Sequence, residues 1–265
     1  MKIDVLDHGF VRLVSFMQPA AQGVNEDANR MDPPRWTGDL EIVRNARVSY
    51  NADWRSEREE AAEDKPYRAD KDERLIHYLW KNQHTSPFEA MVFTFEVQAP
   101  MFIFRQWHRH RTWSYNEVSA RYTELPELFY VPAPEHVGRQ SKDNKQARTI
   151  GEALQESFEL SYWATNERMG SFPEAVRIHS QEAFKLYKYC LSVGVPRELA
   201  RSLLPMNTYS RMFATVDLRN LFHFLKLRLH EHAQYEIRVY AEALLQLVRP
   251  ICPIAVAAFE ESIGL

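Results

Sequence analysis

The sequence predicts an α+β fold, a single domain in which a β-sheet core is flanked by helices and the C-terminal half is mostly helical. Segments before Val131 are short and β-like, whereas those after it have helical composition or spacing. No Gly-x-Gly-x-x-Gly loop is present, so we expect no Rossmann fold. The 265 residues, 45% apolar and 26% charged, suit one buried core, and we expect one domain over residues 1–265.

The first β-like pieces lie at the N-terminus. Residues 1–15 contain short runs rich in Val, Leu and Phe, divided by Asp-His-Gly, which is typical of a strand, a turn and a second extended piece. A short helix is predicted over residues 39–48, where apolar and small residues recur at near-helical spacing. Thr37 or Asp39 would be its N-cap.

A charged insertion is expected next. Residues 51–74 hold 15 Asp, Glu, Lys or Arg residues of both signs, together with Pro66, and cannot bury much apolar surface. From Asp72 the segment DERLIHYLWKNQ begins with acids and places its apolar residues on one face, which predicts a helix.

A half-buried strand is predicted over residues 91–97. Its apolar residues Met91, Phe93 and Phe95 alternate with neighbours that would face the other side, and Pro100 would end it. Composition and spacing then predict helices over residues 140–169, 172–193, 218–229 and 237–248. The second of these follows a Gly170-Ser171 break and has Pro173 in its first turn.

The overall charge and the cysteine content argue against several classes of protein. The net charge of −3 gives no global reason to bind nucleic acid or an anionic membrane, so any anion site must be local. Two thiols, Cys190 and Cys252, are too few for a disulfide scaffold, which favours a reducing cytoplasm. The N-terminus lacks an export-signal pattern, and the uncharged stretch 250–259 is too short to span a membrane.

The most unusual segment is RQWHRHRTWSYNEVSAR, residues 105–121, with four arginines, two histidines and one acid. Arginine offers a planar fork of donors that matches phosphate oxygens, and a serine hydroxyl adds a neutral donor. A phosphorylated ligand would therefore suit Arg109, Arg111, Ser119 and Arg121. The alternative is a solvated basic face, against which Trp107 and Trp113 indicate partial burial.

Three other interpretations of this segment are weaker. Aromatic residues among the arginines could stack bases of a single-stranded nucleic acid, but one short patch on an acidic chain is little support. His84, His108 and His110 could bind a metal, and the latter pair would project together from a strand, yet neighbouring arginines would repel a cation. Ser119 as a nucleophile would need a base, and no Gly-x-Ser-x-Gly elbow surrounds it.

The segment RHRTWSYNEVS, residues 109–119, fits the RHR-x7-S signature of the flavin-dependent thymidylate synthases, and the chain resembles that family. The resemblance extends through HTSPFEAMVFTFEVQAP (84–100), VPRELARSLLPMNTYSR (195–211) and LRNLFHFLKLRLHEHAQYEI (218–237). It implies conversion of dUMP to dTMP, with 5,10-methylenetetrahydrofolate as carbon donor, FAD as redox carrier and NADPH as reductant. It also implies a homotetramer whose active sites are shared between subunits.

The resemblance assigns residues to each ligand. The FAD site would be lined by Ser86, Arg109, His110, Arg111, Glu117, Asp217, Leu218, Arg219 and His223. The dUMP site would take Gln106, Trp107, His108 and Arg109 from one subunit, and Glu117, Val118, Ser119, Ala120, Arg121, Arg201 and Arg228 from another. Further active-site candidates are His84, Asn116, Tyr122 and Gln234; no metal is expected.

Arg228 is the expected catalytic residue, because a fixed cation would stabilise negative charge that develops on the uracil ring. No cysteine nucleophile is expected, since Cys190 has helical apolar surroundings and Cys252 lies near prolines. Asp217 departs from the family pattern, in which asparagine is common, and would bring a negative charge toward the flavin unless Arg219 offsets it.

The alternative is a protein of a different functional class. It would be a nucleotide or nucleic-acid binding module that has the arginine-rich segment but catalyses no reaction. A module that only binds phosphate would not need Arg228 together with the other non-phosphate candidates of the site. These are His84, Ser86, Arg219 and His223. Their joint presence favours the enzyme.

Overall fold

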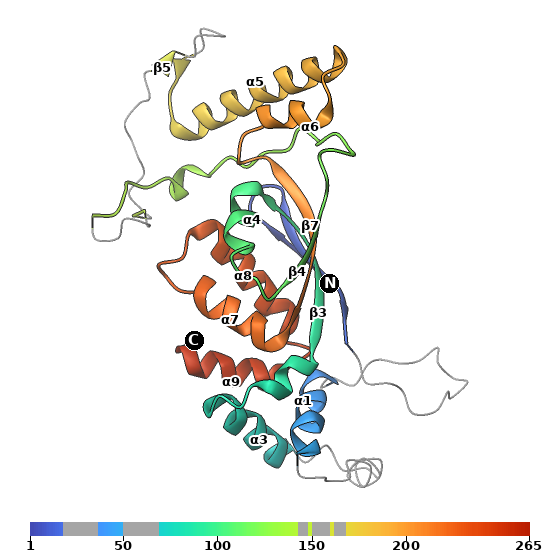
Figure 1. The fold of residues 1–265 in the computed structure, drawn as a ribbon. Helices are drawn as coiled ribbons and strands as arrows, with labels where there is room; N and C mark the ends of the chain where they lie inside the picture. The colour runs from blue at the N-terminus through green and yellow to red at the C-terminus, as the bar shows by residue number, and fades with distance from the viewer. Residues whose placement is uncertain (18–36, 50–68, 143–147, 150–159, 162–167) are drawn as a thin grey trace.

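An antiparallel sheet of order β1-β2-β3-β7-β4 is the centre of the fold (Figure 1). Its strands are β1 (Lys2–Val5), β2 (Gly9–Phe16), β3 (Val92–Pro100), β7 (Tyr209–Asp217) and β4 (Ser114–Glu117). The computed structural model describes residues 1–17, 37–49, 69–142, 148–149, 160–161 and 168–265. The predicted α+β class is confirmed, and the two N-terminal strands lie where the sequence places them.

The central pair of strands, β3 and β7, is in register along its whole length, from Val92 opposite Asp217 to Pro100 opposite Tyr209. The predicted alternation in β3 is confirmed, since Phe93, Phe95 and Val97 are fully buried. Glu96 is the exception, because its carboxylate lies on the opposite face of the sheet and is also buried. Ion pairs with Arg12 and Arg211 compensate its charge there.

Helices cover one face of the sheet and extend beyond both of its ends (Figure 1). They are α1 (Thr37–Val48), α3 (Ala69–Lys81), α4 (Met101–Trp107), α5 (Phe172–Ser192), α6 (Arg197–Ala200), α7 (Leu218–Arg228), α8 (Tyr235–Val248) and α9 (Pro253–Ile263). Short 3-10 turns span Ser86–Ala90, Pro134–His136 and Arg201–Leu203. Within the described segments, no helix has the length and apolar run needed to cross a membrane.

The main core lies between the sheet and helices α7 and α8, and it continues between α3, α7 and α9. In it, the Trp80 ring packs edge-on against Phe222 and Phe259, which stack on each other at 4.5 Å. A buried carboxylate joins the N-terminal helix to this core: Asp39 accepts hydrogen bonds from the backbone N–H groups of Ile254 and Ala255 in α9. Burial raises the pKa of Asp39 to about 6.

A smaller core stabilises the α5–α6 unit at one end of the molecule (Figure 1). Phe184 and Tyr187 of α5 pack there with Ala200 of α6. The predicted proline lies in the first turn of α5, and Ser171 is the N-cap of this helix, accepting from the Glu174 N–H.

Several sequence predictions need correction. Residues 140–169 were expected to be helical, but their described part forms a Gln140–Arg148 bridge and the hairpin of β5 (Leu160–Ser161) and β6 (Arg168–Met169). Helix α3 begins at Ala69, so the last residues of the charged insertion are helical. Residues 50–68 lie outside the described part of the chain. Strand β7 and helix α9 were not predicted from the sequence.

Candidate active site

The basic segment is a helix end, a turn and a short strand. Helix α4 ends at Trp107, the His110 N–H bonds the Trp107 carbonyl in the turn, and β4 then pairs with β7. His108 and His110 therefore do not project together, as they would from a strand. The His108 ring lies against Tyr115, whereas that of His110 lies against Phe224 of α7.

His110 and Arg228 form the polar centre of the site. Arg228, at the end of α7, donates from Nε to His110 Nε2 at 3.1 Å and from Nη2 to the Gln106 carbonyl at 3.2 Å. Burial, then the neighbouring Arg228 and His223, lower the pKa of His110 to about 4. The imidazole is therefore neutral near pH 7, so its Nε2 can accept from the guanidinium.

Two amide side chains continue this centre toward α8. Gln106, in the last turn of α4, donates from Nε2 to Gln234 Oε1 at 2.5 Å. Gln234 is the residue that precedes α8, and its Nε2 donates in turn to Glu236 at 2.8 Å. The structure thus brings three of the predicted site residues into one hydrogen-bonded group around His110: Gln106, Gln234 and Arg228.

A second group lies at the start of α7. Arg219 and His223 are exposed on the face opposite the buried Leu218, Leu221 and Leu225, as helical spacing predicts. The Arg219 Nε donates to the Thr85 hydroxyl at 3.0 Å, and its Nη1 pairs with Glu89 at 3.3 Å. Thr85 precedes the 3-10 turn that contains the predicted Ser86, and Glu89 lies within it, so Arg219 contacts that turn.

Asp217 caps helix α7. Its carboxylate accepts from the Asn220 N–H at 2.9 Å and from the Asn220 side-chain amide at 2.6 Å. The carboxylate is held by the helix terminus, where a negative charge is favourable. Arg219 instead pairs with Glu89, so the ion pair expected from the sequence between Arg219 and Asp217 is not formed.

A third group lies near α6. The Ser119 Oγ accepts from the Arg121 N–H, and the Arg121 side chain pairs with Glu198 at 3.6 Å. Arg201 donates to the Glu198 carbonyl at 3.3 Å. Nearby, the Ser210 hydroxyl donates to Glu117 at 2.7 Å. In the part of one chain that the structure describes, no hydrogen bond or ion pair joins Ser119, Arg121 or Arg201 to Arg228.

The remaining candidates differ in exposure. Trp107 is fully buried between Phe224 and Tyr240, so it is a core residue. Ala120 is also buried. The exposed candidates are His84, Arg109, Arg111, Asn116 and Tyr122. Among the described residues, no group of three His, Cys, Asp or Glu side chains lies close enough to hold a metal, so His84, His108 and His110 do not form that alternative site.

Two arginines in the turn after α4 could bind a diphosphate such as that of a flavin dinucleotide. Arg109 and Arg111 are exposed and have no carboxylate partner among the described residues, whereas Arg121 and Arg219 each pair with a glutamate. Two exposed, unpaired guanidinium groups suit the charge of a pyrophosphate. His223, at a ring distance of 6.1 Å from His110, adds a polar side chain toward the same turn.

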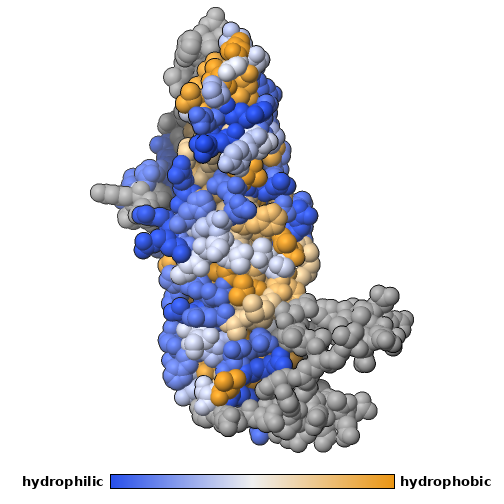
Figure 2. All heavy atoms as spheres, turned by 45° about the vertical axis from the view of Figure 1, so that its right-hand side comes forward, coloured by the Kyte–Doolittle hydropathy of each residue, from blue (hydrophilic) through white to orange (hydrophobic). Residues whose placement is uncertain are grey.

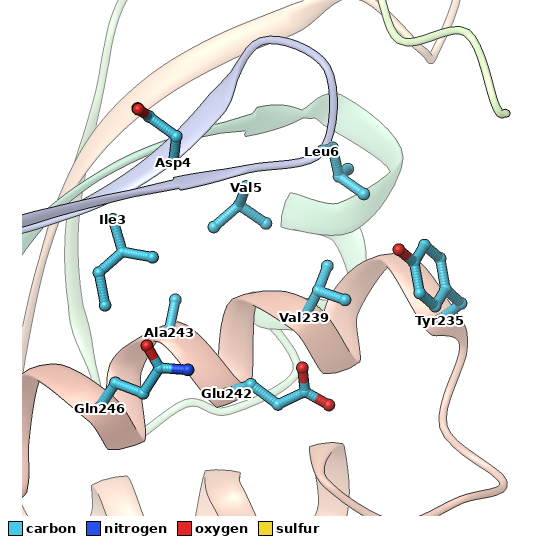
Figure 3. Close-up of a pocket in the computed structure, with 9 residues that line it drawn as sticks. All are labelled: Ile3, Asp4, Val5, Leu6, Tyr235, Val239, Glu242, Ala243 and Gln246. Carbon is cyan, nitrogen blue, oxygen red and sulfur yellow. The ribbon is translucent and has the colours of Figure 1, made fainter.

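Glu236, which is only 2% exposed, was not predicted from the sequence. Its position one helical turn before the buried Tyr240 was the available signal, because a charged residue on an apolar helix face needs buried partners. An open pocket of about 260 Å³ lies nearby, between β1 and α8 (Figure 3). None of the predicted site residues lines it.

Residues 35–254 match the family described as Thymidylate synthase complementing protein. A protein of Treponema denticola named flavin-dependent thymidylate synthase is 41% identical over 97% of this chain and 80% of its own. The Thermus thermophilus protein of the same name is 42% identical over 98% of this chain and 79% of its own.

Two solved structures of the UMP/dUMP methylase PolB from Streptomyces cacaoi also match. The complex with 5-Br dUMP is 31% identical, covers 98% of this chain and 97% of its own, and superimposes with a TM-score of 0.68. The complex with 5-Br UMP is 30% identical, covers 98% and 96%, and gives a TM-score of 0.70. The chain therefore belongs to the thymidylate synthase complementing protein family, the family of the flavin-dependent thymidylate synthases.

Proposed function

We propose that this enzyme converts dUMP to dTMP, with FAD as redox carrier, 5,10-methylenetetrahydrofolate as carbon donor and NADPH as reductant. The observation that carries the proposal is the anchored guanidinium of Arg228, bound by His110 and by the Gln106 carbonyl. An anchored cation meets negative charge as it develops on a pyrimidine, without reorganising during the reaction. When bound, FAD supplies the redox chemistry that the protein side chains lack.

Neutral His110 has a positioning role in this proposal. A protonated imidazole would repel Arg228 and could not accept its Nε–H, but the lowered pKa of His110 keeps the ring neutral in the physiological range. The ring therefore holds Arg228 in place while leaving its positive charge available to the substrate.

Arg109 and Arg111 would bind the FAD pyrophosphate, with Ser86, Glu117, Asp217, Leu218, Arg219 and His223 completing the FAD site. Asp217 enters that site through backbone or capping contacts, because its carboxylate oxygens are already bound to Asn220.

The dUMP phosphate would be bound by Ser119, Arg121 and Arg201. The ion pair between Arg121 and Glu198 is weak, because its atoms are 3.6 Å apart and both side chains are half-exposed. If this pair opened, the Arg121 guanidinium could bind the phosphate. The uracil would lie near Arg228 and Gln106, which contact each other within one chain. Arg228 is therefore grouped with Gln106 and not, as the resemblance implied, with Ser119 and Arg121 on another subunit.

We propose that these two halves meet between subunits of a homotetramer. The support is that no hydrogen bond or ion pair joins the Ser119 group to the Arg228 group in the described part of one chain, and that exposed apolar side chains are present which a partner could cover. On the α5–α6 unit these are Leu186, Tyr189, Val193, Leu199 and Leu203, and on the uncovered face of β7, Phe213. Figure 2 shows hydrophobic residues at the upper end and across the middle of this side of the molecule.

No protein nucleophile is needed in this proposal. Cys252 is fully buried, and burial raises the pKa of its thiol well above the ordinary value. Cys190 packs against the small core of the α5–α6 unit. Both cysteines are free, which suits a reducing cytoplasm.

The test is dTMP formation by the FAD-loaded protein supplied with NADPH and methylenetetrahydrofolate, with dUMP and UMP as separate substrates. We expect methylated product from dUMP, dependent on every component. Turnover of UMP as well as dUMP would instead assign the activity named for the PolB structures, that of a UMP/dUMP methylase. Nucleotide binding without any product would favour the binding-module alternative.

A further inference from the structure

Glu236 is a buried carboxylate beside the proposed nucleotide site. Its Oε1 accepts from the Tyr130 hydroxyl at 3.1 Å and from Arg148 Nη2 at 2.8 Å. Its Oε2 accepts from Gln234 Nε2 at 2.8 Å. These bonds offset the cost of burying the charge, because each oxygen has a donor and Arg148 supplies the opposite charge.

The carboxylate fixes the direction of the Gln234 amide. An ionised carboxylate can only accept hydrogen bonds, so the side-chain NH₂ group of Gln234 must face it. The side-chain oxygen of Gln234, Oε1, must then face the other way. That oxygen accepts from Gln106 Nε2 at 2.5 Å. A single acceptor-only group thus sets the orientation of two successive amides.

The end of this relay is the side chain of Gln106. Its nitrogen is bound by Gln234, and in the described part of the chain no donor binds its Oε1. Gln106 lies in the last turn of α4, where its backbone carbonyl holds Arg228. Its amide oxygen is therefore left as an acceptor beside the group that binds the pyrimidine nucleotide.

We propose that Glu236 is a positioning residue that, through Gln234, makes Gln106 present an oxygen rather than an NH₂ group to the nucleotide. The inference rests on the proposed function, since it concerns the site assigned to dUMP. It extends that function by a residue that does not itself touch the substrate.

The direction of the relay gives a specific prediction for Glu236→Gln. The new amide must keep its oxygen toward Tyr130 and Arg148, so its NH₂ group would face Gln234. Gln234 and then Gln106 would have to turn over, and Gln106 would present a donor in place of an acceptor. A mismatched hydrogen bond of this kind weakens dUMP binding by about tenfold.

The exchange of the two residues should repair this defect. In the double variant Q234E/E236Q, the acceptor-only group is at position 234 and can accept both from the new amide at 236 and from Gln106 Nε2. Gln106 would again present its oxygen. We expect the double variant to recover most of the dUMP affinity that E236Q loses.

Tyr130→Phe is the matched control. It removes a hydrogen bond from the same carboxylate but leaves Oε2 facing Gln234. We expect Y130F to be less stable to heat than the wild-type protein, with unchanged dUMP affinity. A purely structural role of Glu236 would instead make Y130F and E236Q similar in both properties.

The experiment measures the dissociation constant of dUMP and the KM and kcat of the FAD-loaded wild-type, E236Q, Q234E/E236Q and Y130F proteins. We expect E236Q to raise Kd and KM more than it lowers kcat, and the exchange to reverse this. Wild-type affinity in E236Q, or no recovery in the double variant, would overturn the relay. If E236Q does not fold, Gln234→Ala breaks the relay outside the buried cluster and must show the same loss of affinity. Failure of the wild-type protein to bind dUMP would refute the proposed function instead.

Discussion

Replacement of Arg228 perturbs the proposed mechanism at its centre. Two of the five N–H donors of the guanidinium are used by His110 and the Gln106 carbonyl, which leaves the outer edge of the fork for the substrate. Removal of one preorganised donor of this kind costs on the order of 100-fold to 1,000-fold in turnover. We therefore expect Arg228→Ala to lower kcat by about that factor.

The effect should be on chemistry rather than on folding. Arg228 is half-buried at a helix end. Its partner His110 is neutral, so removal of Arg228 leaves no unpaired charge on His110. Arg228→Lys should recover only part of the activity, because a single ammonium cannot bond His110 and Gln106 and still offer a fork to the substrate.

The assay for these variants is single-turnover dTMP formation at saturating dUMP, with flavin content and thermal unfolding measured alongside. Lys226→Ala is the matched control, since Lys226 is an exposed cation in the same helical turn and should be dispensable. Near-normal turnover by a folded, FAD-containing R228A protein would refute the role of Arg228.

Three further predictions concern other residues. Ser119→Ala should weaken dUMP binding but leave turnover at saturation, and loss of all turnover with dUMP still bound would favour a nucleophilic serine. The folded protein lowers the pKa of His110 from 6.5 to about 4, so between these pH values the unfolded chain binds a proton that the folded protein does not. The stability of the wild-type protein should therefore fall as the pH falls from 6.5 to 4. In thermal melts over this range, the melting temperature of the His110→Gln variant should fall less steeply than that of the wild-type protein. Asp39→Ala should lower the free energy of unfolding by about 1–2 kcal/mol in urea titrations, because two helix N–H groups lose their acceptor; an unchanged midpoint would contradict this.

The parts of the fold with strong periodicity could be predicted from the sequence. Strand β3 and helices α7 and α8 each have one apolar face against the core, and their alternation or spacing is clear. Helix α9 was missed because it is apolar on most sides and has little periodicity. Strand β7 was missed because Phe213 is exposed and Ser210 buried, which blurs its alternation.

The candidate site shows the same limit. The polar stripe of Arg219 and His223 follows from helical spacing within one element. The contact between Arg228 and His110 joins residues 118 positions apart, and the contact between Glu236 and Tyr130 joins residues 106 apart. Spacing along the chain contains no information on such partners, so their roles become visible only when the fold places them together.

The most direct test of the central claim is the visible absorption spectrum of the purified protein, followed under anaerobic conditions by addition of NADPH with and without dUMP. We expect an oxidised-flavin spectrum that NADPH bleaches, and faster bleaching when dUMP is present. A colourless protein that takes up no added FAD and binds no dUMP would contradict this expectation.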